Sequence, residues 1–319
     1  MMSQPLIEIK NLKKYFSTPK GKLHAVDDVT LSIGRGKTLG VVGESGCGKS
    51  TLGSTVIRLL EPTEGQVLFN GENIYEKNKH EMKAIRREMQ MIFQDPYSSL
   101  NPRMTVGELI AEPLIVNKVY PSAAQRDEKV RELMDTVGLA QRLINAYPHE
   151  LDGGRRQRIG VARALALDPQ FIVCDEPVSA LDVSIQAQIL NLLMDLQDEK
   201  GLTYMFITHD LSVVKHISDE IAVMYLGKCV ERASAKELFD NPLHPYTKAL
   251  LSAIPIISVD EGDKFANLIK GEVTSPINPP AGCRFASRCD FCTEGCRGQD
   301  IPLREVTPGH FVACKLCEK

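Results

Sequence analysis

Short apolar runs alternate with longer amphipathic segments along the first 235 residues of the chain. Such runs have the length and continuity of strands that are buried on both faces of a parallel sheet. Between them, residues 184–201 repeat apolar positions at helical spacing and end in Gly201, a typical helix stop. The alternation predicts an α/β core, with buried strands at 38–43, 171–176, 204–210 and 221–227.

Three other segments depart from this alternation. Residues 6–16 and 25–33 alternate apolar and polar positions, which is typical of half-exposed antiparallel strands. Residues 105–165 are mostly helical in pattern and contain no clear strand. We therefore expect one domain over 1–235, with an antiparallel β flank and an α-helical subdomain at about 96–165. Beyond residue 235 the composition shifts to Pro, Asn, His and Cys, which predicts a small Cys-rich C-terminal extension over 236–319.

The composition is that of an ordinary globular protein, with 43% hydrophobic and 25% charged residues. A net charge of −3 argues against nonspecific electrostatic binding of nucleic acid. No apolar run approaches the ~20 residues that span a bilayer, and the N-terminus lacks the apolar core of a signal peptide. We therefore expect a cytoplasmic chain whose membrane contact comes through a partner.

The sequence "GESGCGKST" at 43–51 follows a predicted buried strand and fits the phosphate-loop pattern G-x-x-x-x-G-K-[ST]. Its glycines let the backbone fold into a nest of N–H groups around phosphate oxygens. Lys49 would reach the outer phosphates and the Ser50 hydroxyl would hold Mg²⁺. The alternative interpretation is a glycine-rich turn that contains a lysine by chance and binds no phosphate. The predicted phosphate-binding residues are Gly43, Glu44, Ser45, Gly46, Cys47, Gly48, Lys49, Ser50 and Thr51.

The sequence "FIVCDEP" places two acids at the end of a second buried strand. Asp175 would bind Mg²⁺ through water, and Glu176 would polarise an attacking water. Alternatively, the two acids simply end a strand at the surface. A GTPase is disfavoured because the N-K-x-D-like stretch at 114–120 ends in Tyr120 instead of the base-specific acid. A small-molecule kinase would not need the element at 149–165 or the cysteine-rich tail.

Taken in order across residues 6–235, these motifs resemble the ATP-binding subunit of an ABC transporter, which implies a P-loop NTPase core that binds ATP and Mg²⁺. By this resemblance, Gln94 is the Q-loop glutamine, which contacts Mg²⁺ or water and senses the membrane subunits. Asp182 belongs to the D-loop, and His209 is the switch histidine that contacts the γ-phosphate. Phe16 stands where an aromatic ring stacks on adenine, and Tyr15 is the second candidate.

Two further stretches, 94–108 and 241–255, are similar to the oligopeptide/dipeptide importer ATPases, and this resemblance covers essentially the whole chain. It implies a second, different ABC ATPase subunit, two transmembrane permease subunits, an external substrate-binding protein, and a place at the cytoplasmic face of the membrane. Nickel and oligosaccharide remain open as cargo, because relatives in this group carry them.

Two other classes of ABC protein fit the sequence less well. Soluble ABC ATPases that act on ribosomes or DNA usually have two tandem domains or a long coiled-coil insertion, and this sequence has neither. A non-hydrolysing regulatory subunit should lack Glu176 or His209. No nucleic-acid partner is expected.

The sequence "LDGGR" at 151–155 stands where the family signature L-S-G-G-Q belongs. In the family this element contacts the γ-phosphate of the partner's ATP, so Asp152, Gly153, Gly154 and Arg155 would face it. A carboxylate about 4 Å from a phosphate charge costs about 4 kcal/mol at an effective dielectric near 20. The resemblance thus implies a degenerate site opposite this chain. Alternatively, Asp152 only caps the helix at 155–165 and pairs with Arg155.

Six of the nine cysteines lie beyond residue 282, which in a reducing compartment suggests a metal more than disulfides. Several family members carry a four-iron, four-sulfur cluster on a C-x5-C-x6-C…C pattern, which Cys283, Cys289, Cys296 and Cys314 match. Cys292 and Cys317 are extra, and they complete two C-x2-C pairs suited to Zn²⁺. A third possibility is a set of reduced thiols. Either metal would stabilise the fold of the C-terminal extension, which is too short to bury a large hydrophobic core of its own.

Overall fold

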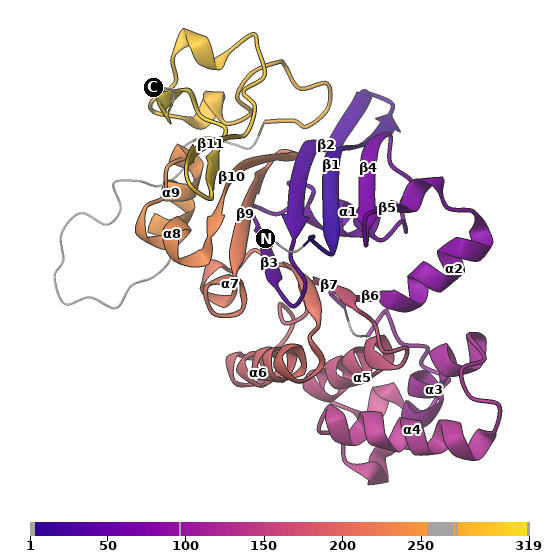
Figure 1. Cartoon of the computed structure of the whole chain (residues 1–319). Helices are drawn as coiled ribbons and strands as arrows, with labels where there is room; N and C mark the ends of the chain where they lie inside the picture. The colour runs from indigo at the N-terminus through magenta and orange to yellow at the C-terminus, as the bar shows by residue number, and fades with distance from the viewer. Residues whose placement is uncertain (1–3, 96, 254–270, 272–273, 318–319) are drawn as a thin grey trace, which may run out of the picture. The chain divides into compact units, whose positions relative to one another are not determined.

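The computed structural model of the chain describes residues 4–95, 97–253, 271 and 274–317 (Figure 1). Two compact units are present: unit 1 joins Met1–Tyr75 to Phe206–Lys319, and unit 2 is Glu76–Met205. Pro96, at which the predicted helical subdomain begins, and residues 254–270 of the predicted extension lie outside the described residues.

Unit 1 contains an antiparallel sheet of four strands in the order β2-β1-β4-β5. Ile7 pairs with Ile33 on one side and with Phe69 on the other, which brings the apolar faces of three strands into register. This sheet confirms the antiparallel flank predicted from residues 6–16 and 25–33. Its strands are β1 Ile7–Thr18, β2 Gly21–Ile33, β4 Glu64–Phe69 and β5 Glu72–Asn73.

A second set of strands in unit 1 has the order β11-β12-β10-β9-β3. The buried strands β3 and β9 pair in parallel, as the continuous apolar runs predict. The hairpin β11–β12 from the C-terminal extension adds to the antiparallel strand β10. The strands are β3 Thr38–Val42, β9 Glu220–Tyr225, β10 Lys228–Ser234, β11 Arg304–Thr307 and β12 His310–Val312, and β8 Thr203–Ile207 runs across the boundary of the units.

A buried carboxylate ties the extension to β10. Glu231 accepts hydrogen bonds from the backbone N–H groups of Leu243 (2.7 Å) and His244 (3.0 Å), and its Oε1 lies 2.8 Å from His310 Nε2. The extension thus lies within unit 1, and the predicted boundary after residue 235 falls after the first residue of α8. The helices of unit 1 are α1 Lys49–Val56, α7 Leu211–Ile217, α8 Ala235–Asp240 and α9 Pro245–Ser252, with short 3-10 turns at Ile74–Glu76, Ala286–Arg288, Glu294–Cys296 and Lys315–Cys317.

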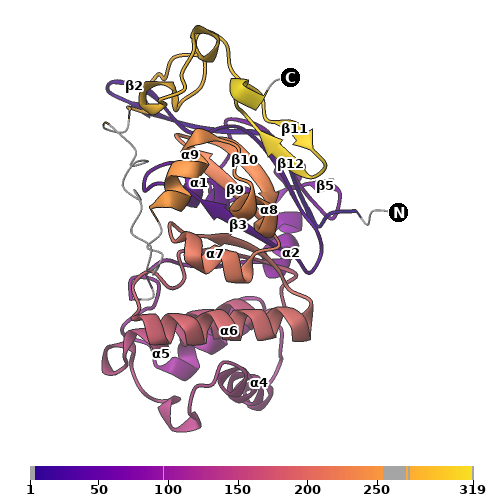
Figure 2. The ribbon, with the colours of Figure 1, turned by 90° about the vertical axis from the view of Figure 1, so that its left-hand side faces the viewer.

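Unit 2 pairs two parallel strands, β6 Met89–Ile92 and β7 Phe171–Asp175, and is otherwise helical. Thr105 and Glu108 form a capping box at the start of α3, and α6 ends at Gly201, whose φ of 66° is left-handed. Figure 2 shows α4, α5 and α6 gathered together. The helices are α2 Lys79–Glu88, α3 Val106–Val116, α4 Ala123–Thr136, α5 Gly153–Leu165 and α6 Val183–Lys200, with 3-10 turns at Gln141–Leu143 and Pro148–Glu150.

Candidate functional site

The predicted phosphate loop joins β3 to α1 in unit 1, so the strand–loop–helix context is confirmed. Gly48 caps α1 with a left-handed φ of 103°, and a Cβ there would lie 1.9 Å from the carbonyl oxygen of Ala25. A Cβ on Gly43 would lie 2.2 Å from the carbonyl oxygen of Met224. Both positions therefore require glycine, because the neighbouring backbone approaches too closely for any side chain.

Lys49 is buried, with 5% of its surface exposed. Its Nζ donates hydrogen bonds to the carbonyl oxygens of Gly43 (2.8 Å) and Glu44 (3.1 Å). The ammonium group thus lies against the backbone of the predicted phosphate loop. Positive charge and backbone N–H groups in one loop are what a phosphate group requires.

The two predicted acids lie at the carboxyl end of β7 in unit 2. Asp175 is the last residue of the strand and is 7% exposed. Glu176 follows with a φ of 45°, a left-handed conformation that costs a non-glycine residue about 1–3 kcal/mol and is concentrated at functional sites. Gln94 Nε2 donates a 2.9 Å hydrogen bond to Glu176 Oε2. The fold therefore brings two of the predicted catalytic residues together.

Asp182 caps α6, where its Oδ1 accepts hydrogen bonds from Ser184 Oγ (2.7 Å) and the Ile185 N–H (3.0 Å). These bonds lower the pKa of the carboxyl group. His209 lies in unit 1 and is exposed, two residues after β8 ends.

The two aromatic candidates in β1 differ in their contacts. The Tyr15 ring stacks on His24 at 4.0 Å between centroids, and its hydroxyl donates to Asp27. Phe16 is half-buried, with Lys14 Nζ 4.9 Å from its ring centroid. Because the Tyr15 ring is already engaged, Phe16 is the better adenine-stacking candidate of the two.

Asp152 is the N-cap of α5. Its Oδ1 accepts a hydrogen bond from the Arg155 N–H (2.8 Å), and its Oδ2 lies 3.4 Å from Arg155 Nε. Both side chains are exposed, Asp152 to 60% and Arg155 to 47%. The glycine pair serves packing, since a Cβ on Gly154 would lie 2.6 Å from Ile185 Cγ2. The cap and the ion pair of the alternative interpretation are thus both present.

The four cysteines of the predicted cluster pattern, Cys283, Cys289, Cys296 and Cys314, line one small cavity of about 10 Å³. Burial and the charges of neighbouring thiolates raise the pKa of Cys283 and of Cys314 to about 11. Cys292 and Cys317 do not line the cavity. Within residues 4–95, 97–253, 271 and 274–317, no group of three or more His, Cys, Asp or Glu side chains is arranged to hold a metal ion.

None of the helices in the described part of the chain has the length and apolar character that crossing a membrane requires.

The comparisons with known proteins agree with this organisation. Residues 26–179 match the ABC transporter family, and residues 230–296 match the oligopeptide/dipeptide transporter C-terminal region. The chain is 54% identical to the oligopeptide transport ATP-binding protein OppF of Bacillus subtilis over 99% of its own length and 98% of the relative's. It is 52% identical to the dipeptide transport ATP-binding protein DppF of Haemophilus influenzae, over 97% and 96% of the two chains.

Among solved structures, the ATP-binding cassette MJ0796 bound to ADP and Pi is 31% identical, with a TM-score of 0.66. The match covers 72% of this chain and 98% of that one. The cbiO1 protein of Clostridium perfringens is 25% identical, with a TM-score of 0.67 over 75% and 92% of the two chains. The protein is therefore an ATPase with the P-loop NTPase fold, and it belongs to the ABC transporter ATP-binding proteins of the oligopeptide/dipeptide transport family.

Proposed function

We propose that this chain is the ATP-hydrolysing subunit of an importer that takes up oligopeptides or dipeptides across the cytoplasmic membrane and is bound at the membrane's cytoplasmic face. Relatives named for oligopeptide and dipeptide transport match nearly the full length at more than half identity, which supports this cargo. The observation that carries the catalytic assignment is the strained Glu176 in contact with Gln94.

In the proposed site, ATP binds through its phosphates to residues 43–51, and Phe16 stacks on adenine. The hydroxyl of Ser50 and the side-chain oxygens of Gln94 and Asp175 are hard donors of the kind that Mg²⁺ prefers, and the ion would neutralise phosphate charge. Glu176 polarises the attacking water and His209 contacts the γ-phosphate. These roles follow the family's motifs, residue by residue.

The hydrogen bond from Gln94 to Glu176 connects the segment that carries Gln94 directly to the proposed base. Gln94 lies two residues beyond β6, in the segment that leads to α3. To contact Mg²⁺ or water, the Gln94 amide must share or leave its contact with the Glu176 carboxylate. A movement of this segment therefore changes the hydrogen bonding of the base, which is a route for conformational gating of hydrolysis.

A groove in unit 2 supports the proposed docking of permease subunits. It has a volume of about 400 Å³ and lies along α3 and the start of α4. Ile115 and Val116 line it and are 54% and 62% exposed. An apolar helix end that is exposed in this way is typical of a surface that a partner covers. We infer that a short helix of a permease subunit binds here.

The test is peptide uptake in cells that lack this chain. Wild-type chain should restore uptake of a labelled peptide, and Ile115→Glu should reduce both the uptake and the co-purification of the chain with the permease subunits by more than tenfold, because a buried charge opposes docking. Met194→Glu on α6, also an exposed apolar position, is the matched control. Normal uptake with Ile115→Glu would refute the docking site. Restored uptake of nickel or an oligosaccharide, but not of peptide, would reassign the cargo.

We also propose that the chain works beside a different ATPase subunit and that the site facing Asp152 is degenerate. The Asp152 carboxylate already accepts the Arg155 N–H, at the helix N-terminus where the family binds the partner's γ-phosphate. The exposed pair with Arg155 is worth at most about 1 kcal/mol, so the negative charge persists. The cap and the charge act together: Asp152 stabilises α5 and also competes with the phosphate.

For the extension we propose an iron–sulfur cluster held by Cys283, Cys289, Cys296 and Cys314. All four line one cavity, but at about 10 Å³ it has room for only about one water molecule, so binding of a cluster would require the four thiols to move apart. Each thiolate of a four-iron cluster binds a different iron, so the sulfurs need not converge on one point as they do around Zn²⁺. The raised pKa of Cys283 and Cys314 implies that a bound metal must displace their protons. The cluster would staple the extension.

Metal analysis of anaerobically purified chain tests this proposal. We expect about four iron and four sulfide per chain. Cys296→Ser should remove most of both, because that thiolate is a ligand. Cys292→Ser is the matched control and should keep them. One zinc per chain, lost on replacing Cys292 or Cys317, would favour the zinc alternative, and metal-free chain with a normal unfolding temperature would reject both.

A further inference from the structure

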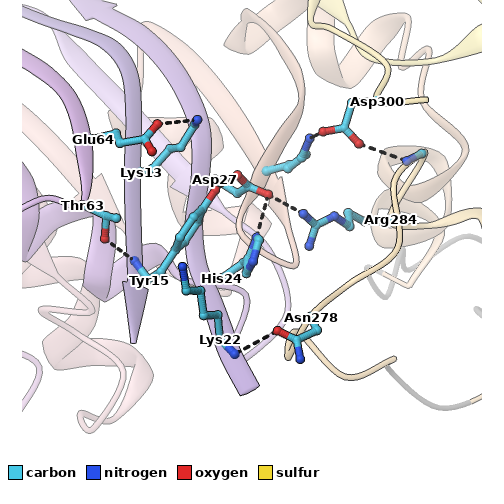
Figure 3. A network of polar contacts seen from close by, with 12 residues as sticks. Lys13, Tyr15, Lys22, His24, Asp27, Thr63, Glu64, Asn278, Arg284 and Asp300 are labelled. Atoms are coloured by element: carbon cyan, nitrogen blue, oxygen red, sulfur yellow. Dashed lines mark hydrogen bonds and ion pairs between the residues drawn. The ribbon is translucent and has the colours of Figure 1, made fainter. Parts of the chain in front are cut away.

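Two arginines lie next to cysteines in the sequence "CRFASRC" at 283–289. Both side chains are buried in unit 1: Arg284 is 5% exposed and Arg288 is 7% exposed. Each pairs with an acid far away in the sequence, Arg284 with Asp27 and Arg288 with Glu44. Figure 3 shows the first pair. The cysteine-rich extension therefore reaches the part of unit 1 that carries the phosphate loop.

Of the two pairs, the one between Arg288 and Glu44 involves a residue of the phosphate loop itself. Arg288 Nη1 lies 2.9 Å from Glu44 Oε2 and 3.2 Å from Oε1, and it donates to the Tyr225 hydroxyl at 3.3 Å. The Glu44 side chain is 25% exposed. The partial burial makes this pair stronger than a surface ion pair, because less water screens it.

Glu44 is the first variable position of the phosphate loop, so its negative charge stands in the element proposed to bind a polyanion. Left unpaired, that carboxylate would repel phosphate. The extension also holds the backbone at this position, because the Glu44 N–H donates a 2.9 Å hydrogen bond to the Tyr246 hydroxyl of α9. The side-chain carboxylate and the backbone N–H of Glu44 are thus held by residues from beyond 235.

Arg284, through Asp27, stabilises backbone that contacts the same phosphate loop. Asp27 accepts from Arg284 and from Tyr15, and its N–H donates to the Gly227 carbonyl at 2.8 Å. The Gly227 N–H in turn donates to the Cys47 carbonyl at 2.8 Å, within the phosphate loop. Burial opposes ionisation of the Asp27 carboxyl group, but its hydrogen bonds with Tyr15 and His24 and the charges of Lys228 and Arg284 lower its pKa, so the pair with Arg284 is ionic.

We propose that Arg288 is a positioning residue for nucleotide binding, which cancels the charge of Glu44 and holds the phosphate loop in its binding conformation. The cysteine-rich extension thereby sets the affinity of the chain for ATP. This inference rests on the proposed ATP site. Arg284 supports the same loop from behind.

The test measures the dissociation constant of MgATP for the full chain by titration calorimetry. Arg288→Met should weaken binding roughly tenfold, the size expected from losing a charged hydrogen bond of about 1.5 kcal/mol. The double variant Glu44→Gln/Arg288→Met should recover binding to within about threefold, because no unpaired carboxylate remains. Arg297→Met is the matched control: Arg297 also adjoins a cysteine, is exposed, and should bind as wild type does.

Three outcomes are decisive. Wild-type affinity in Arg288→Met overturns the inference and leaves the proposed function intact. Weak binding that Glu44→Gln does not rescue also overturns it, since Arg288 would then act only through packing. If wild type and Arg297→Met both fail to bind MgATP, the proposed function itself is wrong.

A further variant covers the case in which Arg288→Met does not fold, as judged by its unfolding temperature and iron content. Glu44→Gln alone leaves the Arg288 charge beside the loop and should bind MgATP more tightly than wild type at low salt. This gain should shrink as salt is raised. Weaker or unchanged binding would refute the inference.

Discussion

Glu176→Gln is expected to lower ATP turnover by the assembled transporter about 10²–10⁴-fold, the usual contribution of a positioned base. Gln is nearly isosteric with Glu and leaves an oxygen that can still accept the 2.9 Å hydrogen bond from Gln94. The site should therefore keep its geometry and lose only its ability to polarise water. Phosphate release should slow by the same factor while bound ATP persists on the chain, which a filter-binding assay with labelled ATP measures.

Glu199→Gln on α6 is the matched control for this change, because it removes the same charge from an exposed position of unit 2. It should keep wild-type turnover. Turnover by Glu176→Gln above about a tenth of wild type would mean that another group polarises the water.

The purified chain alone is expected to turn over ATP slowly, and Asp152→Ser/Arg155→Gln should raise that rate at least tenfold. In a homodimer, each ATP would face the altered signature, and a carboxylate near phosphate costs about 4 kcal/mol at 4 Å and an effective dielectric of 20. The gain should require Glu176 and should increase with protein concentration, because two copies must meet. Steady-state phosphate release over a range of chain concentrations measures both effects.

Asp152→Asn separates the two roles of this residue. Asn caps a helix about as well as Asp, so the start of α5 is preserved while the charge is removed. Activation by Asp152→Asn would identify the charge as the cause. Brisk turnover by the wild-type homodimer would instead show that Asp152 is only a helix cap, and the proposed asymmetry would be wrong.

The elements that the sequence predicts correctly are those with a clear hydrophobic pattern, either a continuous apolar run or helical spacing. The buried strands β3, β7, β8 and β9 are continuous apolar runs, and α6 has both helical spacing and a glycine stop. Strand β6 was missed, because its four residues follow directly on the charged helix α2 and are too short to establish a period. The hairpin β11–β12 was missed for the same reason, since its strands have four and three residues.

The phosphate loop could be predicted because its chemistry is local: spacing within nine residues defines it. The contacts of Glu44 could not, since they join position 44 to Tyr246 and Arg288, which are brought close only by the fold. The bond between Gln94 and Glu176 is similar, because its partners are 82 positions apart. Sequence motifs identified the chemical groups, and the fold determined their partners.

The pairing of β12 with β10 also covers one edge of the sheet in unit 1. The registers Glu231 to Val312 and Arg232 to Phe311 cover backbone groups that β10 would otherwise present at the edge of its sheet. An open edge of that kind recruits strands from other chains. A version of this ATPase that ended at residue 235 would expose that edge, so we expect it to aggregate more readily than the full chain.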